Sequence, residues 1–392
     1  MKLQKACIGV LAVACVAGAS ACGSSSGNGN SSSTSPAANA SAAAATSSGV
    51  TAAKAAVAAA LTEPAQIPET TPLPRAPKKG TKVIFLTCSA AACSLLNPGF
   101  TAAAKALGWD PTVITYNSAT PGAAVQQAIN EGYKYIATTS ITLDTITPQV
   151  QEMKAKGIAF FEAYTSDTPE FAKNGLYGDA QNAQGDVKTG GLMADWLIAN
   201  SDGKANVVYV DISLYPSLVG QGQGASAEFT KLCPSCKFAT LPVSVTQLGA
   251  GQVPSAIVTY LQSHPSVNYL YLSFQDLDAG VYAAMRTAGL TSRVKIVGTE
   301  AEATQLHEVV NGQETMWSIL PEPYVMWEVV DWMARQSEGL LTPAALAADD
   351  SGVDFIVDTP KAAQAQLTAD GGNWPGPVNY AAQFEKLWHV GS

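Results

Sequence analysis

The sequence predicts an α/β protein with two lobes, each a doubly wound parallel sheet with helices on both faces. Short β-rich runs alternate with helical stretches from about residue 82 onward, and this order is typical of parallel sheets. The pattern restarts after Asp179, so one series of elements is expected to build each lobe. The chain has 392 residues, and the part that follows an atypical first 79 is long enough to bury a core in each lobe.

The first lobe is predicted from apolar runs that end at turn residues. The run at 82–87 has the composition of a buried strand, and the apolar helical pattern that follows it ends at Gly108. We expect strands at 82–87, 112–116, 135–139, 158–164 and 175–177, with helices at 100–107, 121–131 and 148–156 between them.

The second lobe is predicted from the same alternation after Asp179, although no residue-level repeat links the two series. A long helical pattern at 186–200 opens the series, and an amphipathic one closes it. We expect strands at 206–212, 238–245, 269–273, 294–298, 315–319 and 354–357, and helices at 186–200, 224–232, 253–264, 280–288, 303–311, 323–338 and 380–388.

The head of the chain has the pattern of an export signal. Lys2 and Lys5 precede an apolar run at 6–21 that is too short to span a membrane as a helix. Ala19-Ser20-Ala21-Cys22 resembles a bacterial lipobox, in which the cysteine is lipidated, although Ala19 stands where a large aliphatic residue is usual. The alternative is an ordinary signal peptide cut near Ala21.

The segment after Cys22 has the composition of a tether. Small and polar residues dominate 23–48, and five prolines between 64 and 77 favour an extended chain. We therefore expect a signal peptide at 1–21 and an anchored, disordered tether at 22–79, with a short helix at 52–61.

Composition excludes several classes of function. The net charge is −9 and only 14% of the residues are charged, which argues against nucleic acid or an anionic membrane surface as the main partner. The three histidines, His264, His307 and His389, are far apart in sequence, so a histidine-rich metal site is excluded. We expect no cofactor and no metal.

Four cysteines follow the tether, in two close pairs. In an oxidising compartment Cys88 with Cys93, and Cys233 with Cys236, predict two local disulfides. Cys233-Pro-Ser-Cys236 also fits a thioredoxin-type redox motif, but it follows a helix and leads into a strand, which is the wrong context. A zinc site is disfavoured by the unequal spacing of the pairs.

Local motifs give little support for catalysis. Gly220-Gln-Gly222-Gln-Gly224-Ala225 fits a dinucleotide-binding pattern, but it lies too far after its strand and lacks the acidic residue that should follow. No nucleophile elbow is present. Asp276 with Asp278, and Glu300 with Glu302, follow predicted strand ends, where they are either solvated loop charges or acceptors for ligand hydroxyls.

A set of short motifs, taken in order, resembles the ribose-type (type I) periplasmic binding proteins, the substrate receptors of bacterial ABC importers. The motifs are Asn97-Pro-Gly-Phe100, Gln275-Asp-Leu-Asp-Ala-Gly280, Val297-Gly-Thr-Glu300 and Leu320-Pro321. The end of the chain, Tyr380 to Trp388, and the cysteine pairs look like an actinobacterial lipoprotein branch of that family. The resemblance covers about residues 81–390.

The family resemblance implies a hinge of three crossover strands, near Asp179, 319–321 and 354–357. The first lobe would then comprise 80–180 and 321–354, and the second lobe 181–320 and 355–392. Carried over by position, the ligand-binding residues would be Asn97, Phe100, Gln275 or Asp276, and Glu300. Tyr164 and Tyr215, which lie where the family would have arginines nearby, are added as candidate ligand-binding residues. The family's usual arginines are absent and Gly99 replaces a stacking aromatic, which suggests a ligand other than free ribose.

These observations predict an extracytoplasmic, lipid-anchored binding protein that is a monomer and not an enzyme. It would capture a sugar, a polyol or a small phenolic compound by closing its lobes, and deliver the ligand to an ABC permease. The alternatives are a sensory receptor on the same fold and, with less support, an exported hydrolase.

Overall fold

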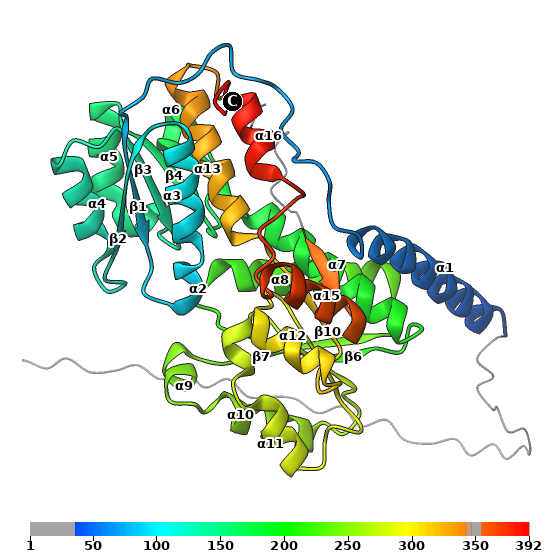
Figure 1. Ribbon diagram of the computed structural model, residues 1–392. Coiled ribbons are helices and arrows are strands. Elements are labelled where there is room, and N and C mark those ends of the chain that lie inside the picture. Colours follow the sequence, from blue (N-terminus) through cyan, green and yellow to red (C-terminus); the bar gives the residue numbers. More distant parts are fainter. Residues whose placement is uncertain (1–35, 343–345, 347–353, 392) are drawn as a thin grey trace, which may run out of the picture. The chain divides into compact units, whose positions relative to one another are not determined.

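The first lobe contains a five-stranded parallel sheet in the order β2-β1-β3-β4-β5 (Figure 1). The computed structural model describes residues 36–342, 346 and 354–391, so the predicted signal peptide and Cys22 lie outside the described residues. The strands are β1 (Lys82–Thr87), β2 (Asp110–Thr115), β3 (Tyr135–Thr139), β4 (Ala159–Ala163) and β5 (Leu176–Ala180). The helices that follow in sequence are α2 (Ala91–Ser94), α3 (Leu96–Ala106), α4 (Pro121–Asn130), η1 (Leu143–Ile146), α5 (Thr147–Lys156) and α6 (Phe171–Asn174).

Alternate residues of the buried strand β1 face opposite layers of helices. Val83 and Phe85 pack in the cluster that includes α3, while Ile84 and Leu86 pack with α4 and α5. This alternation follows from the two-residue period of a strand, and it requires β1 to be apolar throughout. The predicted doubly wound arrangement of the first lobe is confirmed.

The second lobe contains a six-stranded sheet in the order β11-β10-β9-β8-β6-β7, which is parallel except for the β10–β11 pair. Its strands are β6 (Asn206–Asp211), β7 (Lys237–Pro242), β8 (Tyr269–Leu272), β9 (Lys295–Gly298), β10 (Met316–Ile319) and β11 (Phe355–Val357). Its helices are α7 (Ala183–Asn200), α8 (Pro216–Leu232), α9 (Val245–Gly249), α10 (Val253–Ser263), η2 (Gln275–Asp278), α11 (Val281–Thr287), α12 (Ala303–Val310) and α15 (Pro360–Asp370).

Glycines bring α7 and α8 together on one face of this sheet. A Cβ atom at Gly190 would lie 1.9 Å from the backbone oxygen of Gln221, and one at Gly224 would lie 2.0 Å from that of Val187. Only glycine permits so close an approach of two helix backbones. The glycine-rich stretch that imitates a dinucleotide motif therefore lies inside a helix, where it serves packing.

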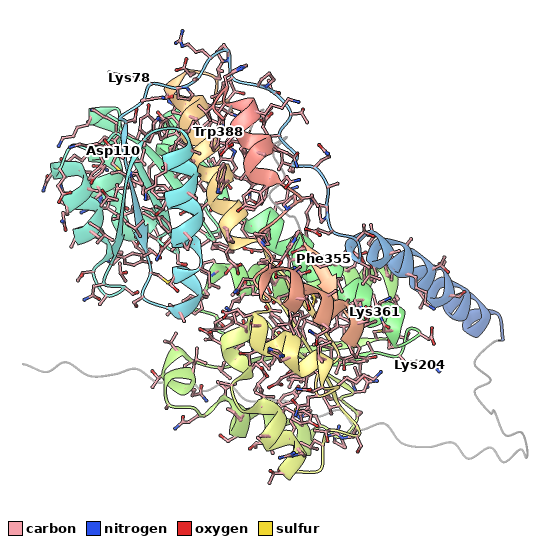
Figure 2. All side chains as sticks on the ribbon, viewed as in Figure 1. Lys78, Asp110, Lys204, Phe355, Lys361 and Trp388 are labelled. Atoms are coloured by element: carbon pink, nitrogen blue, oxygen red, sulfur yellow. A yellow bond between two sulfur atoms is a disulfide. The ribbon has the colours of Figure 1, made fainter. Side chains whose placement is uncertain are left out.

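From β1 onward, the described chain crosses between the lobes near the three expected places and once more after α15. After β10 it enters α13 (Glu322–Ser337), which packs on α3, β4 and β5, and it returns to the second sheet at β11. It then leaves α15 for α16 (Tyr380–Leu387), which packs on α13. The rings of Trp327 and Trp388 stack there at 5.3 Å, and Trp388 lies beside α13 (Figure 2). The expectation that all of 355–392 belongs to the second lobe therefore does not match the structure.

The segment expected to be a disordered tether, 22–79, is structured from Pro36 onward. Helix α1 (Pro36–Ala60) buries Ala53 and Val57 against Trp196 of the second lobe. Residues 61–79 then run onto the first lobe, where the backbone N–H of Leu73 donates to the oxygen of Leu387 (2.8 Å).

Hydrogen bonds from the body fix this proline-rich segment. An extended chain has no internal hydrogen bonds, so its carbonyl groups are free to accept from elsewhere. The indole of Trp109 donates to the oxygen of Lys78 (3.0 Å), and the amide of Gln383 donates to that of Ala65 (3.1 Å).

Both predicted disulfides are present. Cys88 pairs with Cys93 across α2, and Cys233 pairs with Cys236 between α8 and β7, with Cα atoms 5.6 and 5.3 Å apart. Among the described residues, no helix is both long enough and apolar enough to span a membrane.

Candidate ligand-binding cleft

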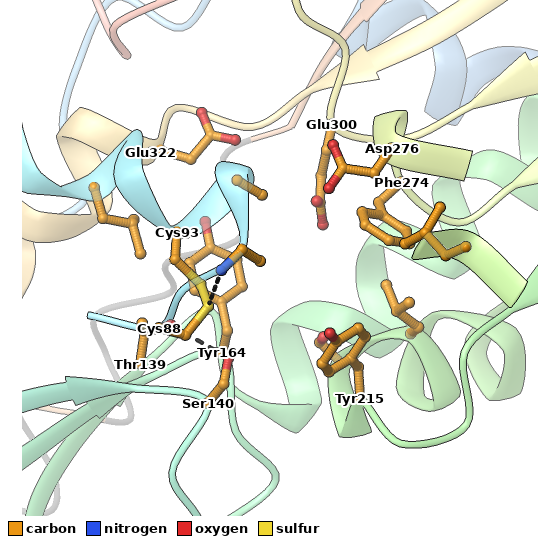
Figure 3. Close-up of a pocket in the computed structure, with 16 residues that line it drawn as sticks. Cys88, Cys93, Thr139, Ser140, Tyr164, Tyr215, Phe274, Asp276, Glu300 and Glu322 are labelled. Carbon is orange, nitrogen blue, oxygen red and sulfur yellow. Dashed lines mark hydrogen bonds between the residues drawn. A yellow bond between two sulfur atoms is a disulfide. The ribbon is translucent and has the colours of Figure 1, made fainter. Parts of the chain in front are cut away.

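A cavity of about 110 Å³ lies between the two lobes (Figure 3). Most of its lining comes from loops and helix starts that follow the carboxyl ends of strands, where doubly wound sheets bind their ligands. The first lobe contributes Cys88, Ala90, Ala92, Cys93, Leu96, Thr139, Ser140, Tyr164 and Glu322. The second lobe contributes Tyr215, Ser217, Leu218, Leu248, Phe274, Asp276 and Glu300.

Three lining residues adopt a left-handed backbone conformation at strand ends. Ser140 follows β3, Tyr164 follows β4 and Glu300 comes two residues after β9, with φ values of 58°, 61° and 65°. Each such residue costs on the order of 1–3 kcal/mol, so the surroundings must hold it in place. The N–H groups of Ser140 and Tyr164 do donate to the next strand, to Ala163 (3.2 Å) and Ala180 (2.9 Å). Strained residues of this kind cluster at functional sites.

Three carboxyl groups, those of Asp276, Glu300 and Glu322, give the cavity an acidic character. Burial raises the pKa of Glu300 well above its usual value, and the carboxyls of Glu322 and Asp276 raise it further. Burial also raises the pKa of Glu322 to about 8, and it raises the pKa of Asp276. Because no lysine, arginine or histidine is among the described residues that line the cavity, these groups lack a basic partner there.

Aromatic rings form the other walls. Tyr215 and Phe274 meet edge to face with ring centres 6.4 Å apart, and Tyr164 lies opposite, beside the Cys88–Cys93 disulfide (Figure 3). The hydroxyl oxygen of Tyr164 is buried and has no hydrogen-bond partner among the described residues. An unsatisfied buried hydroxyl costs about 1–3 kcal/mol, which a ligand in the cavity can recover.

Four of the seven predicted ligand-binding residues, Tyr164, Tyr215, Asp276 and Glu300, line the cavity. Gln275 instead donates to the carboxylate of Glu302 (2.9 Å) and does not reach the lining. Asn97 is half-buried on α3 and also stays outside the lining.

Phe100 was expected to contact the ligand, but it is a core residue. Its side chain is fully buried and packs on Phe85 at 5.4 Å, because this face of α3 covers β1. Gly99 stands where the family has a stacking aromatic, and there is no space for a side chain there. A Cβ atom at Gly99 would lie 2.3 Å from the backbone oxygen of Pro323. A side chain at position 99 would therefore collide with the first turn of α13 (Glu322–Ser337).

Glu322, Phe274 and the Cys88–Cys93 disulfide line the cavity but were not predicted as site residues. A signal existed for each of them. Cys88 directly follows β1, as strand-end ligands do, and Glu322 directly follows the Leu320-Pro321 crossover. Phe274 had the same kind of signal, because it precedes the Gln275-Asp276 pair.

Comparisons with known proteins agree with this architecture. The chain resembles the structures of a carbohydrate transporter from Acidothermus cellulolyticus in complex with myo-inositol (18% identity, TM-score 0.61, 75% of this chain and 99% of that one) and of a 5-methylthioribose transporter solute-binding protein from Thermotoga lettingae (15%, 0.62, 82% and 99%). It also resembles a glucose-galactose binding protein from Geobacillus stearothermophilus (19%, 0.57, 67% and 92%).

These identities support the fold, while the family rests on the sequence profile. A comparison with curated protein sequences finds no match. The family profile described as periplasmic binding protein domain matches residues 83–340. This range includes every strand of both sheets except β11 and Lys82, the first residue of β1. The chain therefore belongs to the periplasmic binding protein domain family.

Proposed function

We propose that this protein is an extracytoplasmic substrate-binding lipoprotein of an ABC importer, which captures a small polyhydroxylated ligand. The observation that carries the proposal is the cavity, to which both lobes contribute hydrogen-bonding side chains. A ligand that contacts Tyr164 on one lobe and Asp276 and Glu300 on the other makes its full set of bonds only when the lobes are closed. That difference in contacts drives hinge closure.

The lining favours a sugar or a polyol over an acid. Carboxyl groups form strong hydrogen bonds with hydroxyls, and aromatic faces pack against the apolar faces of such molecules. The described lining offers no cation to pair with a carboxylate or a phosphate, so an acidic ligand would have to bury its charge without a partner. A small phenolic compound also fits the aromatic walls and belongs in the same test. None of the described lining residues is a histidine, so the hydroxyl groups there lack the base that activates the nucleophile of a histidine-dependent hydrolase.

A thermal-shift screen of matched compounds tests this function. The panel contains neutral sugars and polyols (myo-inositol among them), their amino and acid derivatives, and small phenols. A ligand present at a hundred times its Kd stabilises the folded state by about 2.7 kcal/mol, so a true ligand produces a clear rise in Tm. We expect a hit among neutral or amino compounds and none among the acids. Tight binding of an acid, or of no member of the panel, would contradict the proposed ligand class.

Replacing Glu300 or Asp276 with alanine should weaken binding of the identified ligand about tenfold to a hundredfold. Each loss leaves ligand hydroxyls unpaired in a buried site, at a cost of about 1–3 kcal/mol. Folding should change little, because removing one of three neighbouring carboxyls also relieves repulsion. Calorimetric titration gives the affinity and melting curves give the stability.

The control for these variants is Glu170→Gln, an exposed carboxylate that pairs with Lys173 far from the cavity lining. It should keep full affinity. Full affinity in both Glu300→Ala and Asp276→Ala would remove these residues from the site, and so would a collapse of stability with the affinity intact.

The lipid anchor is supported by the lipobox-like sequence before Cys22 and by the small polar residues after it. We expect Cys22→Ser to release the protein from the membrane fraction, whereas Cys15→Ser, within the apolar run, should leave it attached. Fractionation and mass analysis of the mature N-terminus decide the matter. Attachment of the Cys22→Ser variant would show that another segment holds the protein.

A further inference from the structure

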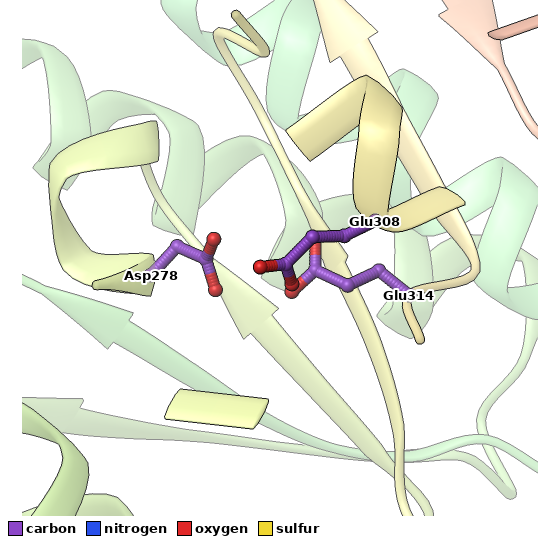
Figure 4. Close-up of side chains that lie close together, drawn as sticks. All are labelled: Asp278, Glu308 and Glu314. Atoms are coloured by element: carbon purple, nitrogen blue, oxygen red, sulfur yellow. The ribbon is translucent and has the colours of Figure 1, made fainter. Parts of the chain in front are cut away.

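Three carboxyl groups converge in the second lobe, outside the residues that line the ligand cavity. Asp278 ends the turn η2, Glu308 lies on α12, and Glu314 lies in the loop before β10. One oxygen from each lies within 4.8 Å of the others, and the three side chains point toward one another (Figure 4). Three different segments of the chain therefore direct acidic groups at one point.

One oxygen of each group is buried and has no hydrogen-bond partner among the described residues. These atoms are Oδ1 of Asp278, Oε2 of Glu308 and Oε1 of Glu314. Asp278 and Glu314 are each only 4% exposed, so water does not supply a full set of partners. Buried acceptors without partners are rare, and each one requires an explanation.

The other oxygens of Asp278 and Glu314 are held by fixed donors. The amide Nε2 of Gln305 donates to Oδ2 of Asp278 (3.1 Å), and the indole of Trp317 donates to Oε2 of Glu314. These donors fix both carboxylates in place, and the side chains converge on one point (Figure 4). Outer partners of this type are what position the ligands of a metal ion.

We propose that Asp278, Glu308 and Glu314 bind a calcium ion. An all-oxygen set of carboxylates suits hard divalent cations. Oxygens on one Ca²⁺ lie about 2.3–2.6 Å from it, so two of them are at most about 5 Å apart, as these atoms are. Mg²⁺ demands near-ideal octahedral geometry and usually keeps several of its waters, which a mostly buried set of three carboxylates suits less well.

No basic side chain among the described residues balances the cluster. None of the three carboxylates forms an ion pair with a lysine, arginine or histidine in the part of the chain that the structure describes. Half-buried Glu308 gives the site a path to solvent and hence an entry route for the ion. A bound cation would tie η2 to α12 and to the start of β10, and η2 also carries the cavity residue Asp276.

Terbium luminescence tests the site directly. Tb³⁺ replaces Ca²⁺ at oxygen sites and emits when a nearby indole is excited, and the indole of Trp317 contacts the proposed ligand Glu314. Titration of Tb³⁺ into the purified, chelator-treated protein should give sensitised emission that Ca²⁺ displaces. Ca²⁺ alone should raise Tm, in the absence of any organic ligand, so the result is independent of the proposed transport function.

Variants locate the bound ion. Asp278→Asn and Glu314→Gln keep the shape of each side chain but remove a charged ligand. Each should weaken Tb³⁺ binding more than about 100-fold, because loss of a residue that only orients a metal ligand already costs about 10- to 100-fold. Glu308→Gln, at a half-buried position, repeats the test if either buried variant fails to fold. Glu63→Gln is the matched control, since Glu63 also accepts a hydrogen bond from an indole, that of Trp374 (3.0 Å), but lies outside the cluster.

Two outcomes would overturn the proposal. If the folded protein gives no sensitised emission and no rise in Tm with Ca²⁺, the carboxyls are held together by shared protons instead. If emission persists at full strength in Glu308→Gln and in a folded Asp278→Asn or Glu314→Gln, the ion binds elsewhere on this acidic protein.

Discussion

Replacing Asp331 with alanine should lower the free energy of unfolding by about 3–5 kcal/mol, which is the usual cost of removing one partner from a buried ion pair. Asp331 is fully buried on α13 and accepts hydrogen bonds from Arg335 Nε (2.5 Å) and from the indole of Trp388 (2.6 Å). Arg335 also donates to the backbone oxygen of Thr71 (2.9 Å). The variant leaves a buried guanidinium without its main counter-charge.

Asp331 and Arg335 connect α13 to Trp388 near the end of the chain and to Thr71 in the segment before the first lobe. Loss of the pair should therefore weaken the packing of both segments on α13. The control is Lys173→Ala, which breaks an exposed ion pair with Glu170 (2.7 Å) and should cost only about 0–1 kcal/mol. Denaturant unfolding of both variants measures the difference. Equal costs would mean that burial gives the Asp331 pair no special role in stability.

Raising the pH from 5 to 7.5 should destabilise the protein, because buried carboxyls on neighbouring strands hold a proton in the folded state that the unfolded chain releases. Glu162 on β4 and Asp179 on β5 are register partners and are both buried. Both lie near the hydroxyl of Thr165, at 2.8 and 2.7 Å, but one hydroxyl donates a single hydrogen. One carboxyl therefore has to supply a proton of its own.

The direction of the effect follows from the pKa shifts. Burial raises the pKa of Asp179 from 3.8 to about 8, with Asp167 adding to the rise, and burial raises the pKa of Glu162 well above its usual value. Between these pH values the folded state keeps a proton that the unfolded chain has released, so stability is full below about pH 4 and falls as the pH rises toward 8. The slope is about 1.4 kcal/mol per pH unit for one proton, or about 3 kcal/mol from pH 5 to 7.5.

The variant Asp179→Asn isolates this contribution. An amide cannot ionise, so the dependence of unfolding free energy on pH should become shallower by about one proton. Asp202→Asn, at an exposed residue paired with Lys54, should leave the slope unchanged. Unfolding curves at a series of pH values and constant ionic strength provide the comparison. An unaltered slope in Asp179→Asn would show that the shared proton resides on other groups.

Local patterning was sufficient for the strands of the body, but helix α15 was not predicted. Apolar runs such as 83–86 are buried on both faces only in the centre of a doubly wound sheet, so the strands and their places along the chain could be predicted from the sequence. The segment before the first lobe was harder to predict. Helix α1 is alanine-rich, and alanine has the highest helix propensity, but small-residue composition also describes a tether. Residues 61–79 are fixed by single buried side chains such as Leu73, which leave no periodic signal.

The site was predictable as far as strand ends determine it. Asp276 and Glu300 follow β8 and β9, and the topology alone brings such positions to one edge. Phe100 was misplaced because the packing of α13 against α3 depends on contacts between residues far apart in sequence. The carboxylate cluster had no sequence signal, since Asp278, Glu308 and Glu314 have no motif spacing and meet only in the folded lobe.

The return of the chain to the first lobe bears on the order of folding. Strands β1 to β5 are complete at Ala180, but α13, which packs on β4 and β5 over the face that carries Phe161, begins only at Glu322. A chain emerging from the ribosome must therefore carry a partly open apolar sheet while most of the second lobe is synthesised. Exposed surface of this kind is where newly made chains aggregate and where chaperones bind. Completion of the N-terminal lobe waits for the C-terminal helices, so neither lobe can mature as an independent unit.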